Sequence, residues 1–286
     1  MEILLEGKTP AEKIKSTFED RLNYLKKNDF CPKLAVLALN MEDASASYVR
    51  RIENNCQKYG IGFKLFNTNS ENEFVEIFDQ VKSNKEYTSI MFQEPLPKQL
   101  ANLINQIEEN RDVEGVSDAN MGKLFKGDTN VNIPCTSRAV IEILNFYKID
   151  LKGKNVVVIG RSNIVGKPLI PQLLNANATV TICHSKTQNM SEIIKKADVV
   201  IVAVGNSNFL KKDMIKDDAV VVDVGINYVN GKLVGDVDYE NVKDKAFAIT
   251  PVPGGVGIVT NALLIENIIA SAERMVKKKE EKWVKE

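Results

Sequence analysis

The chain has 286 residues and carries 38 Asp+Glu against 38 Lys+Arg, so its formal net charge is zero. A neutral chain argues against a protein that wraps nucleic acid or binds a membrane through a basic patch, because both need a positive field. Four widely separated cysteines and a single histidine, His184, argue against a metal site or a disulfide framework and favour the reducing cytoplasm.

The first part of the chain alternates between strand and helix patterns. A first helix is expected from Thr9, an N-cap residue followed by proline at the first helical position. Apolar runs and apolar periodicity predict strands at 33–39, 63–66 and 88–93, and helices at 44–60, 71–83 and 98–109. Strands that alternate with helices indicate βαβ units around a parallel sheet.

A second alternating series follows an irregular stretch. Residues 111–136 are rich in Gly, Asp and Asn, so we place the boundary between two domains here and expect domains at 1–120 and 121–286. The second series has expected strands at 155–159, 179–183, 197–203 and 219–223, and expected helices at 137–147 and from about 164 and 190. A last helix at about 261–279 has one apolar face that must pack against another surface, for which the first domain is a candidate. The predicted fold class is α/β, with two domains built on parallel sheets.

The segment 155–169, NVVVIGRSNIVGKPL, is typical of an apolar strand, a glycine turn and a helix start. Its spacing, Gly160-x-Ser162-x-x-x-Gly166, is related to the GxGxxG fingerprint without matching it. Gly160 permits a tight turn, and N–H groups at a helix N-terminus can hold a pyrophosphate. The pattern favours a Rossmann-like dinucleotide-binding second domain.

The end of the next strand bears on the choice of cofactor. NAD-binding folds usually place a carboxylate there, whereas residues 183–187 read CHSKT and contain none. Arg161, Ser185 and Lys186 suit a 2′-phosphate, since a guanidinium holds phosphate in a bidentate fork. The sequence therefore favours NADP over NAD. We interpret His184 as a polar strand-end residue without a catalytic role, and a cofactor contact stays open for it.

Two further glycine clusters follow expected strands. They are VDVGINY at 222–228 and TPVPGGVGIVT at 250–260. Strand ends of open α/β sheets face the ligand crevice, and the second cluster would allow a flat ligand to approach the backbone closely. A plain tight turn is the alternative.

Taken together, TPVPGGVG, VVVIGRSNIVGKPL, CHSKT and VGINY resemble the methylenetetrahydrofolate dehydrogenase/cyclohydrolase family of one-carbon metabolism. The motifs SASYVRR, QEPLP, GKL and IPCT of the first half fall in the family's order, so the resemblance covers essentially the whole chain. It implies two α/β domains with an active-site cleft between them and NADP-dependent oxidation of 5,10-methylenetetrahydrofolate to 5,10-methenyltetrahydrofolate. Most members then hydrolyse the product to 10-formyltetrahydrofolate, and they are commonly homodimers.

The resemblance also implies roles for individual residues. Tyr48 matches the tyrosine that stacks on the folate ring, and Gln93 matches the glutamine that bonds the catalytic lysine. Glu114 stands at the aspartate of the family's Asp-Val-Asp-Gly motif, and we expect it, with Tyr48 and Gln93, to be catalytic. Substrate contacts are expected from Tyr48, Glu114, Pro95, Pro253, Gly254 and Gly255. Cofactor contacts are expected from Gly160, Arg161, Ser162, Ser185, Ile226 and Thr260.

One departure from the family pattern bears on the chemistry. The family motif is Tyr-x-x-x-Lys, but Ile52 stands at the lysine position, four residues after Tyr48 and on the same helix face. Isoleucine cannot move a proton, and the guanidinium of Arg51 titrates too far above neutrality to serve as a shuttle. Glu114 carries its carboxylate one methylene farther than the family's aspartate, and Ile258-Val259 replace the family's Pro-Met.

These departures affect two reactions unequally. Hydride transfer is mostly the cofactor's chemistry and needs positioning, whereas hydrolysis needs an activated water and a proton carrier. We therefore predict an NADP-dependent dehydrogenase whose cyclohydrolase activity is weak or absent. A fully bifunctional enzyme is the alternative, with another group in place of the lysine. A non-catalytic folate- or NADP-binding protein is a second, against which the intact cofactor loop argues. A generic NADP dehydrogenase would leave Tyr48 and Gln93 unexplained.

Overall fold

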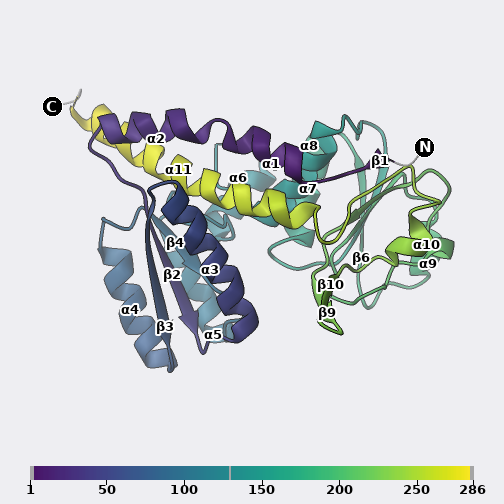
Figure 1. Ribbon diagram of the computed structural model, residues 1–286, viewed down its shortest axis with the longest axis horizontal. Coiled ribbons are helices and arrows are strands. Elements are labelled where there is room, and N and C mark those ends of the chain that lie inside the picture. Colours follow the sequence, from purple (N-terminus) through teal and green to yellow (C-terminus); the bar gives the residue numbers. More distant parts are fainter. Residues whose placement is uncertain (1–2, 129, 284–286) are drawn as a thin grey trace. The chain divides into compact units, whose positions relative to one another are not determined.

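The computed structural model describes residues 3–128 and 130–283 (Figure 1). The chain forms two compact units, each with its own parallel sheet. The six-stranded unit comprises residues 1–13, 124–128 and 133–263, and the three-stranded unit comprises residues 14–123, 129–132 and 264–286. The expected two-domain α/β class is confirmed. The observed units differ from the expected 1–120 and 121–286, because the chain passes between them more than once.

The three-stranded unit is a βαβ arrangement. Its strands are β2 (Lys33–Leu39), β3 (Gly62–Thr68) and β4 (Ser89–Phe92), and their order is β3-β2-β4 with parallel pairing throughout. The helices α3 (Asp43–Lys58) and α4 (Glu71–Ser83) connect them. β2 is the central strand and is buried along its length, which explains its unbroken apolar sequence. Phe74 and Phe78 of α4 pack edge-on against Phe92 in the core.

Shorter helices complete this unit. They are α2 (Phe18–Lys27), α5 (Lys98–Ala101), the 3-10 helix η1 (Asn102–Gln106) and α6 (Asp118–Phe125). The first helix, α1 (Lys8–Lys15), lies mostly in the segment 1–13 of the six-stranded unit. The expected single helix at 98–109 is wrong, since only its first turn is α-helical. Asparagine competes for backbone hydrogen bonds and favours turns over helix interiors. The segment contains Asn102 and Asn105, and the Asn105 side-chain oxygen accepts from the Asp118 N–H, at the first residue of α6, at 2.9 Å.

The six-stranded unit is a doubly wound sheet with the order β1-β11-β8-β7-β5-β6 and parallel pairing throughout. Its strands are β1 (Ile3–Leu4), β5 (Asn155–Ile159), β6 (Thr179–Cys183), β7 (Val199–Val202), β8 (Val220–Asp223) and β11 (Ala248–Ile249). Its helices are α7 (Cys135–Phe146), α8 (Gly166–Asn175), α9 (Met190–Ile194), the 3-10 helix η2 (Lys212–Met214) and α10 (Tyr239–Val242). β9 (Asn227–Val229) and β10 (Lys232–Val234) form a separate antiparallel hairpin.

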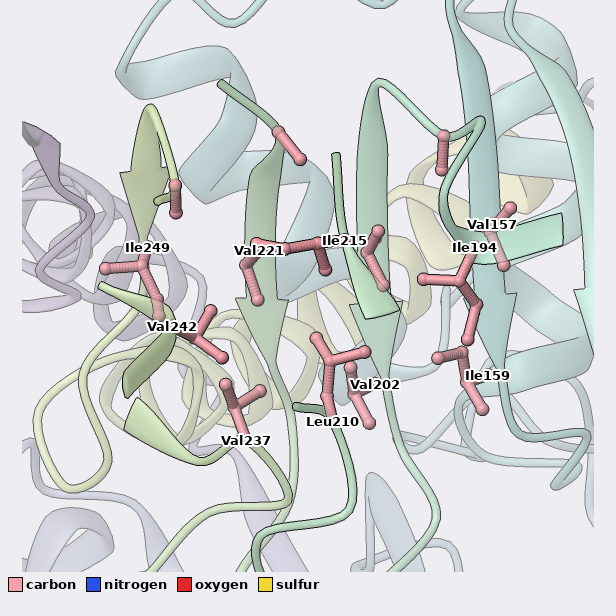
Figure 2. Packing of buried hydrophobic residues seen from close by; sticks show 14 of the residues in the cluster. Val157, Ile159, Ile194, Val202, Leu210, Ile215, Val221, Val237, Val242 and Ile249 are labelled. Carbon is pink, nitrogen blue, oxygen red and sulfur yellow. The ribbon is translucent and has the colours of Figure 1, made fainter. Parts of the chain in front are cut away.

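One core cluster of this unit packs on one face of the sheet. Figure 2 shows side chains of the strands, such as Val202 and Val221, facing residues from the connecting segments, such as Leu210 and Val237. The strand order reverses at β5, which has β6 on one side and β7 on the other. Ligands of doubly wound sheets bind beyond the carboxyl ends of the strands at such a switch point.

The last helix, α11 (Val256–Trp283), begins five residues before the expected start at 261. Residues from 264 onward belong to the three-stranded unit. There Asn267 donates to the Val113 carbonyl at 2.8 Å, and Arg21 of α2 donates to both carboxylate oxygens of Glu273 at 2.9 and 2.7 Å. In the described part of the chain, α11 alone has the length and composition to cross a membrane, but 61% of its most apolar window is buried, as in a core helix.

Candidate functional site

The turn after β5 requires glycine at two positions. Gly160 has φ +127°, and a Cβ there would lie 2.2 Å from the Ala203 carbonyl oxygen. A Cβ on Gly166 would lie 2.1 Å from the Gly160 carbonyl oxygen. No side chain fits at these distances, so the start of α8 can approach the strand end only because both residues are glycine. The structure thus supplies the close approach that the sequence pattern indicated.

The residues between these glycines are held by a local turn. The Ser162 hydroxyl accepts from the Val165 N–H at 3.1 Å, and the Ser162 carbonyl accepts from the Lys167 N–H at 3.0 Å. Arg161 and Ser162 are exposed at this edge of the sheet. Their exposure leaves the guanidinium and the turn accessible to a ligand.

The turn after β6 lies beside that loop, because β5 and β6 are paired neighbours. The His184 N–H donates to the Thr187 hydroxyl at 2.8 Å, and His184 Nδ1 accepts from the Lys186 N–H at 3.2 Å. His184 therefore stabilises its own turn. Ser185 and Lys186 are exposed and follow β6, as the exposed Arg161 follows the neighbouring parallel strand β5.

The loops after β7 and β8 are held by two carboxylates that sequence reasoning missed. Asp223 ends β8 and is 3% exposed, and Asp236 follows β10 and is fully buried. Burial is the largest influence on Asp223 and raises its pKa to about 6, although three backbone N–H groups that donate to it act in the opposite direction. Ile226, an expected cofactor contact, lies in the loop after β8 and is 60% exposed.

The proline–glycine loop packs against the start of the chain. The Gly7 N–H donates to the Gly254 carbonyl at 2.8 Å, and a Cβ on Gly7 would lie 2.1 Å from the Gly255 carbonyl oxygen. The Val252–Pro253 peptide is cis. Thr260 lies one turn into α11, and its hydroxyl donates to the Val256 carbonyl at 3.1 Å. Gly7 was missed in the sequence because only the folded chain brings residue 7 to residue 255.

The three-stranded unit carries the expected substrate residues. Tyr48 and Ile52 lie one turn apart on α3; Tyr48 is half-buried and Ile52 is 1% exposed. Gln93 follows β4, and its Nε2 donates to the Glu94 carbonyl at 2.8 Å. Its Oε1 is buried and has no hydrogen-bond partner within the described residues. A buried amide oxygen without a partner is costly, so this atom is a candidate acceptor for a donor supplied by a ligand.

Glu114 lies in a turn that a second carboxylate organises. Asp112 is fully buried, and its oxygens accept from the N–H groups of Gly115 at 2.9 Å and Ser117 at 2.8 Å. Burial raises the pKa of Glu114 to about 8, and the charges of Asp112 and Glu94 add to this shift. The residue still keeps part of its surface accessible. Glu114 is therefore largely protonated at neutral pH and can donate a hydrogen bond.

Comparison with known proteins assigns both sets of residues to domains of one enzyme family. A family model described as the tetrahydrofolate dehydrogenase/cyclohydrolase catalytic domain matches residues 5–114, and the NAD(P)-binding domain model of the same family matches residues 134–276. The chain belongs to the tetrahydrofolate dehydrogenase/cyclohydrolase family. The catalytic-domain match includes Tyr48, Ile52, Gln93 and Glu114, whereas the NAD(P)-binding match includes the expected cofactor residues.

Relatives of the family cover almost the whole chain. A bifunctional protein FolD of Clostridium botulinum is 46% identical over 277 residues, which span 95% of this chain and 98% of the relative. The crystal structure of the bifunctional FolD methylenetetrahydrofolate dehydrogenase/cyclohydrolase from Campylobacter jejuni is 40% identical, covers 96% of this chain and 100% of that one, and superposes with a TM-score of 0.91. A Trypanosoma brucei FolD, solved with NADP cofactor and an inhibitor, is 29% identical with a TM-score of 0.89, and the match covers 96% of this chain and 98% of that one.

Proposed function

We propose that this protein oxidises 5,10-methylenetetrahydrofolate to 5,10-methenyltetrahydrofolate with NADP, and that it hydrolyses the product weakly or not at all. The dehydrogenase activity and the cofactor are those of its family. The proposal on hydrolysis rests on the buried Ile52 at the family's lysine position, and the Gln93 amide oxygen, which has no partner within the described residues, agrees with it.

The six-stranded unit fits NADP. The glycine turn after β5 lets the start of α8 approach the strand end, because a Cβ on Gly160 or Gly166 would collide with main-chain atoms. The N–H groups at such a helix start can hold a pyrophosphate. Arg161 and Ser185 are exposed at neighbouring strand ends and would hold the 2′-phosphate. Ile226, Ser162 and Thr260 are the other proposed contacts. When bound, NADP accepts a hydride from the methylene carbon of the substrate.

The three-stranded unit supplies the proposed folate contacts. Tyr48 offers an aromatic face to the flat pterin ring. The protonated Glu114 would donate a hydrogen bond to a ring acceptor, and Gln93 Oε1 would accept from a ring N–H. Pro95 borders Gln93 in sequence. In the six-stranded unit, the loop of Pro253, Gly254 and Gly255 is the remaining proposed substrate contact.

Hydrolysis needs a group that takes a proton from the attacking water, and the residues around position 52 supply this poorly. A water that attacks the methenyl carbon must lose a proton, and one well-placed acid/base group contributes about 10²–10⁴-fold to such a step. Ile52 offers only hydrocarbon, and Arg51 is exposed and carries a guanidinium, which is a poor proton shuttle. Oxidation of the methylene group needs no such water, because the protein holds donor and acceptor carbons together.

Full bifunctionality is the second candidate, and one observation favours it. The pKa of Glu114 is raised to about 8, which lies in the range suited to a proton carrier at neutral pH. Relatives that are 44–46% identical also bear the name bifunctional protein. Under this proposal Glu114 takes over the proton transfer of the missing lysine.

Paired assays on the purified protein test the proposal. NADPH formation from 5,10-methylenetetrahydrofolate measures the first step, and loss of 5,10-methenyltetrahydrofolate above its spontaneous rate measures the second. We expect the first and little of the second. Hydrolysis at a rate comparable to oxidation would contradict the proposal and support the bifunctional candidate. We further propose a cytoplasmic homodimer, as the family resemblance implies, and light scattering would test the dimer.

A further inference from the structure

Two buried carboxylates link the loops at the ligand-facing edge of the six-stranded sheet. The oxygens of Asp236 accept from three successive backbone N–H groups, those of Val204 at 2.7 Å, Gly205 at 2.9 Å and Asn206 at 2.9 Å. The same carboxylate accepts from Asn227 Nδ2 at 2.9 Å. One side chain therefore ties the loop after β7 to the first residue of the β9–β10 hairpin.

Asp236 is itself positioned by Asp223. Asp223 Oδ1 accepts from the backbone N–H of Asp236 and of Gly225, both at 2.9 Å, and its Oδ2 accepts from the Val237 N–H at 2.9 Å. Asp223 thus fixes the backbone on both sides of the hairpin. Through these hydrogen bonds Asp223 and Asp236, called the relay below, connect the end of β8, the hairpin and the loop after β7.

Two glycines leave the space that these carboxylates fill. A Cβ on Gly225 would lie 2.2 Å from the carboxyl carbon of Asp236, and a Cβ on Gly235 would lie 1.9 Å from Asp223 Oδ2. The arrangement is therefore built around carboxylates at these two positions and has no room for extra side-chain atoms beside them.

The relay borders the proposed cofactor loop. Ala203, next to the first residue that Asp236 holds, has its carbonyl oxygen 2.2 Å from where a Cβ of Gly160 would stand. Ile226 lies between Gly225, which donates to Asp223, and Asn227, which donates to Asp236. Ile226 is 60% exposed, although hydrogen bonds to the two carboxylates fix the residues on both sides of it. A rigid backbone that presents an exposed apolar side chain suits contact with a ligand.

We propose that Asp236 is a positioning residue of the NADP site, which acts by fixing the 204–206 loop and, through Asn227, the exposed Ile226. This inference rests on the proposed NADP-dependent function. Both oxygens of Asp236 accept hydrogen bonds, so an amide in its place turns an NH₂ group toward at least one N–H donor. Asp236→Asn keeps the shape of the side chain and shifts the loops against the cofactor.

The test compares Asp236→Asn with Asp198→Asn. Asp198 is a matched control, because its carboxylate also accepts from a backbone N–H, that of Asn155 at 2.8 Å, and from Lys216 Nζ. It precedes β7 and therefore lies at the opposite end of the sheet. Calorimetry with NADP⁺ gives the dissociation constant, and steady-state kinetics give kcat and the KM for the folate substrate. Thermal melting checks that each variant is folded.

We expect Asp236→Asn to bind NADP⁺ about tenfold more weakly, with kcat at saturating NADP⁺ and the KM for the folate within about twofold of wild type. Asp198→Asn should bind NADP⁺ as wild type does. A folded Asp236→Asn protein with wild-type NADP⁺ affinity would overturn the proposal. Where that variant does not fold, Asn227→Ala decides: weaker NADP⁺ binding supports the proposal, and unchanged binding overturns it. Failure of the wild-type protein to bind NADP⁺ would instead refute the proposed function.

Discussion

Restoring a lysine at position 52 is the sharpest perturbation of the proposed chemistry. Ile52→Lys places an amine one turn after Tyr48 on α3, in the unit where Gln93 Oε1 lacks a partner within the described residues. Because the family resemblance pairs this glutamine with a lysine at position 52, we expect the amine to donate to that oxygen and to carry the proton that hydrolysis must move. If the remaining pocket is intact, the variant should gain hydrolysis of 5,10-methenyltetrahydrofolate by about 10²–10⁴-fold. The lower end is expected, because Glu114 reaches one methylene farther than the family's aspartate.

The substitution also has a cost that can be measured. Ile52 is 1% exposed, and burial of such a side chain stabilises a fold by about 1.5–3 kcal/mol. Lysine keeps part of this through its stem, but burial disfavours its charged form and lowers its pKa. We expect a net loss of about 2–3 kcal/mol in the free energy of unfolding. At about 2–4 °C per kcal/mol for a unit of this size, the melting temperature should fall by roughly 4–12 °C.

The assay follows both reactions in three proteins. Wild type, Ile52→Lys and Ile52→Met are compared, because methionine conserves volume and should lower stability by less than about 1.5 kcal/mol without adding an amine. Hydrolysis should appear only in the lysine variant, and NADPH formation should persist in all three. The reasoning is refuted if folded Ile52→Lys protein oxidises substrate but hydrolyses no faster than Ile52→Met.

Three further variants test separate parts of the structure. Gly160→Ala should abolish measurable NADP⁺ binding or unfold the six-stranded unit, because its Cβ would stand 2.2 Å from the Ala203 carbonyl oxygen at φ +127°. The free energy of unfolding of Glu114→Gln should rise relative to that of wild type as the pH increases from 4.5 to about 8. Because the pKa of Glu114 is higher in the folded state than in the unfolded state, its carboxyl group stabilises the wild-type fold fully below pH 4.5. This contribution is lost as the pH rises from 4.5 to about 8. Arg111→Leu should cost at least about 3 kcal/mol, because the buried guanidinium donates to four carbonyls of the segment 81–87.

Two of these variants have a matched control variant, and Glu114→Gln is compared with wild type. Gly122→Ala adds a Cβ that meets nothing within 4 Å, so it should leave NADP⁺ binding unchanged. Urea titrations at several pH values give the stability of Glu114→Gln, and parallel curves for variant and wild type would contradict the assigned pKa. Arg138 forms a partly exposed i,i+4 ion pair with Glu142, and such a pair contributes about 0.3–0.5 kcal/mol, so Arg138→Leu should cost much less than Arg111→Leu. A similar loss for Arg111→Leu would show that its hydrogen bonds are dispensable.

Much of the fold could be predicted from local pattern. The continuous apolar run at 33–39 indicated a buried parallel strand because only a strand covered on both faces tolerates such a run, and β2 is that strand. Gly160 and Gly166 pointed to a close approach of helix and strand, since glycine alone lacks the Cβ that would prevent it. The absence of a carboxylate after 179–183 likewise favoured NADP, in agreement with the NADP-bound relative.

Other features depend on residues that are distant in sequence. The pairing of β1 with β11 joins Ile3 to Ala248, and no local pattern indicates such a partner. The unpartnered Gln93 oxygen could not be foreseen either, because satisfaction of a polar atom is decided by what packs around it. The bond between the Asn105 side chain and the Asp118 N–H, thirteen residues away, could likewise not be foreseen from local pattern.

The sequence by itself determined the chemistry that depends on residue type: the glycine turn, the absence of an acidic residue after β6, and an aliphatic side chain where the family has a lysine. The tertiary structure decided what those residues meet. No role was expected for Asp223, the last residue of a predicted strand, or for Asp236, and folding buried both and set them against Gly225 and Gly235. Carboxylates removed from water must find donors, and here the donors are backbone N–H groups of three separate segments that only the folded chain brings together.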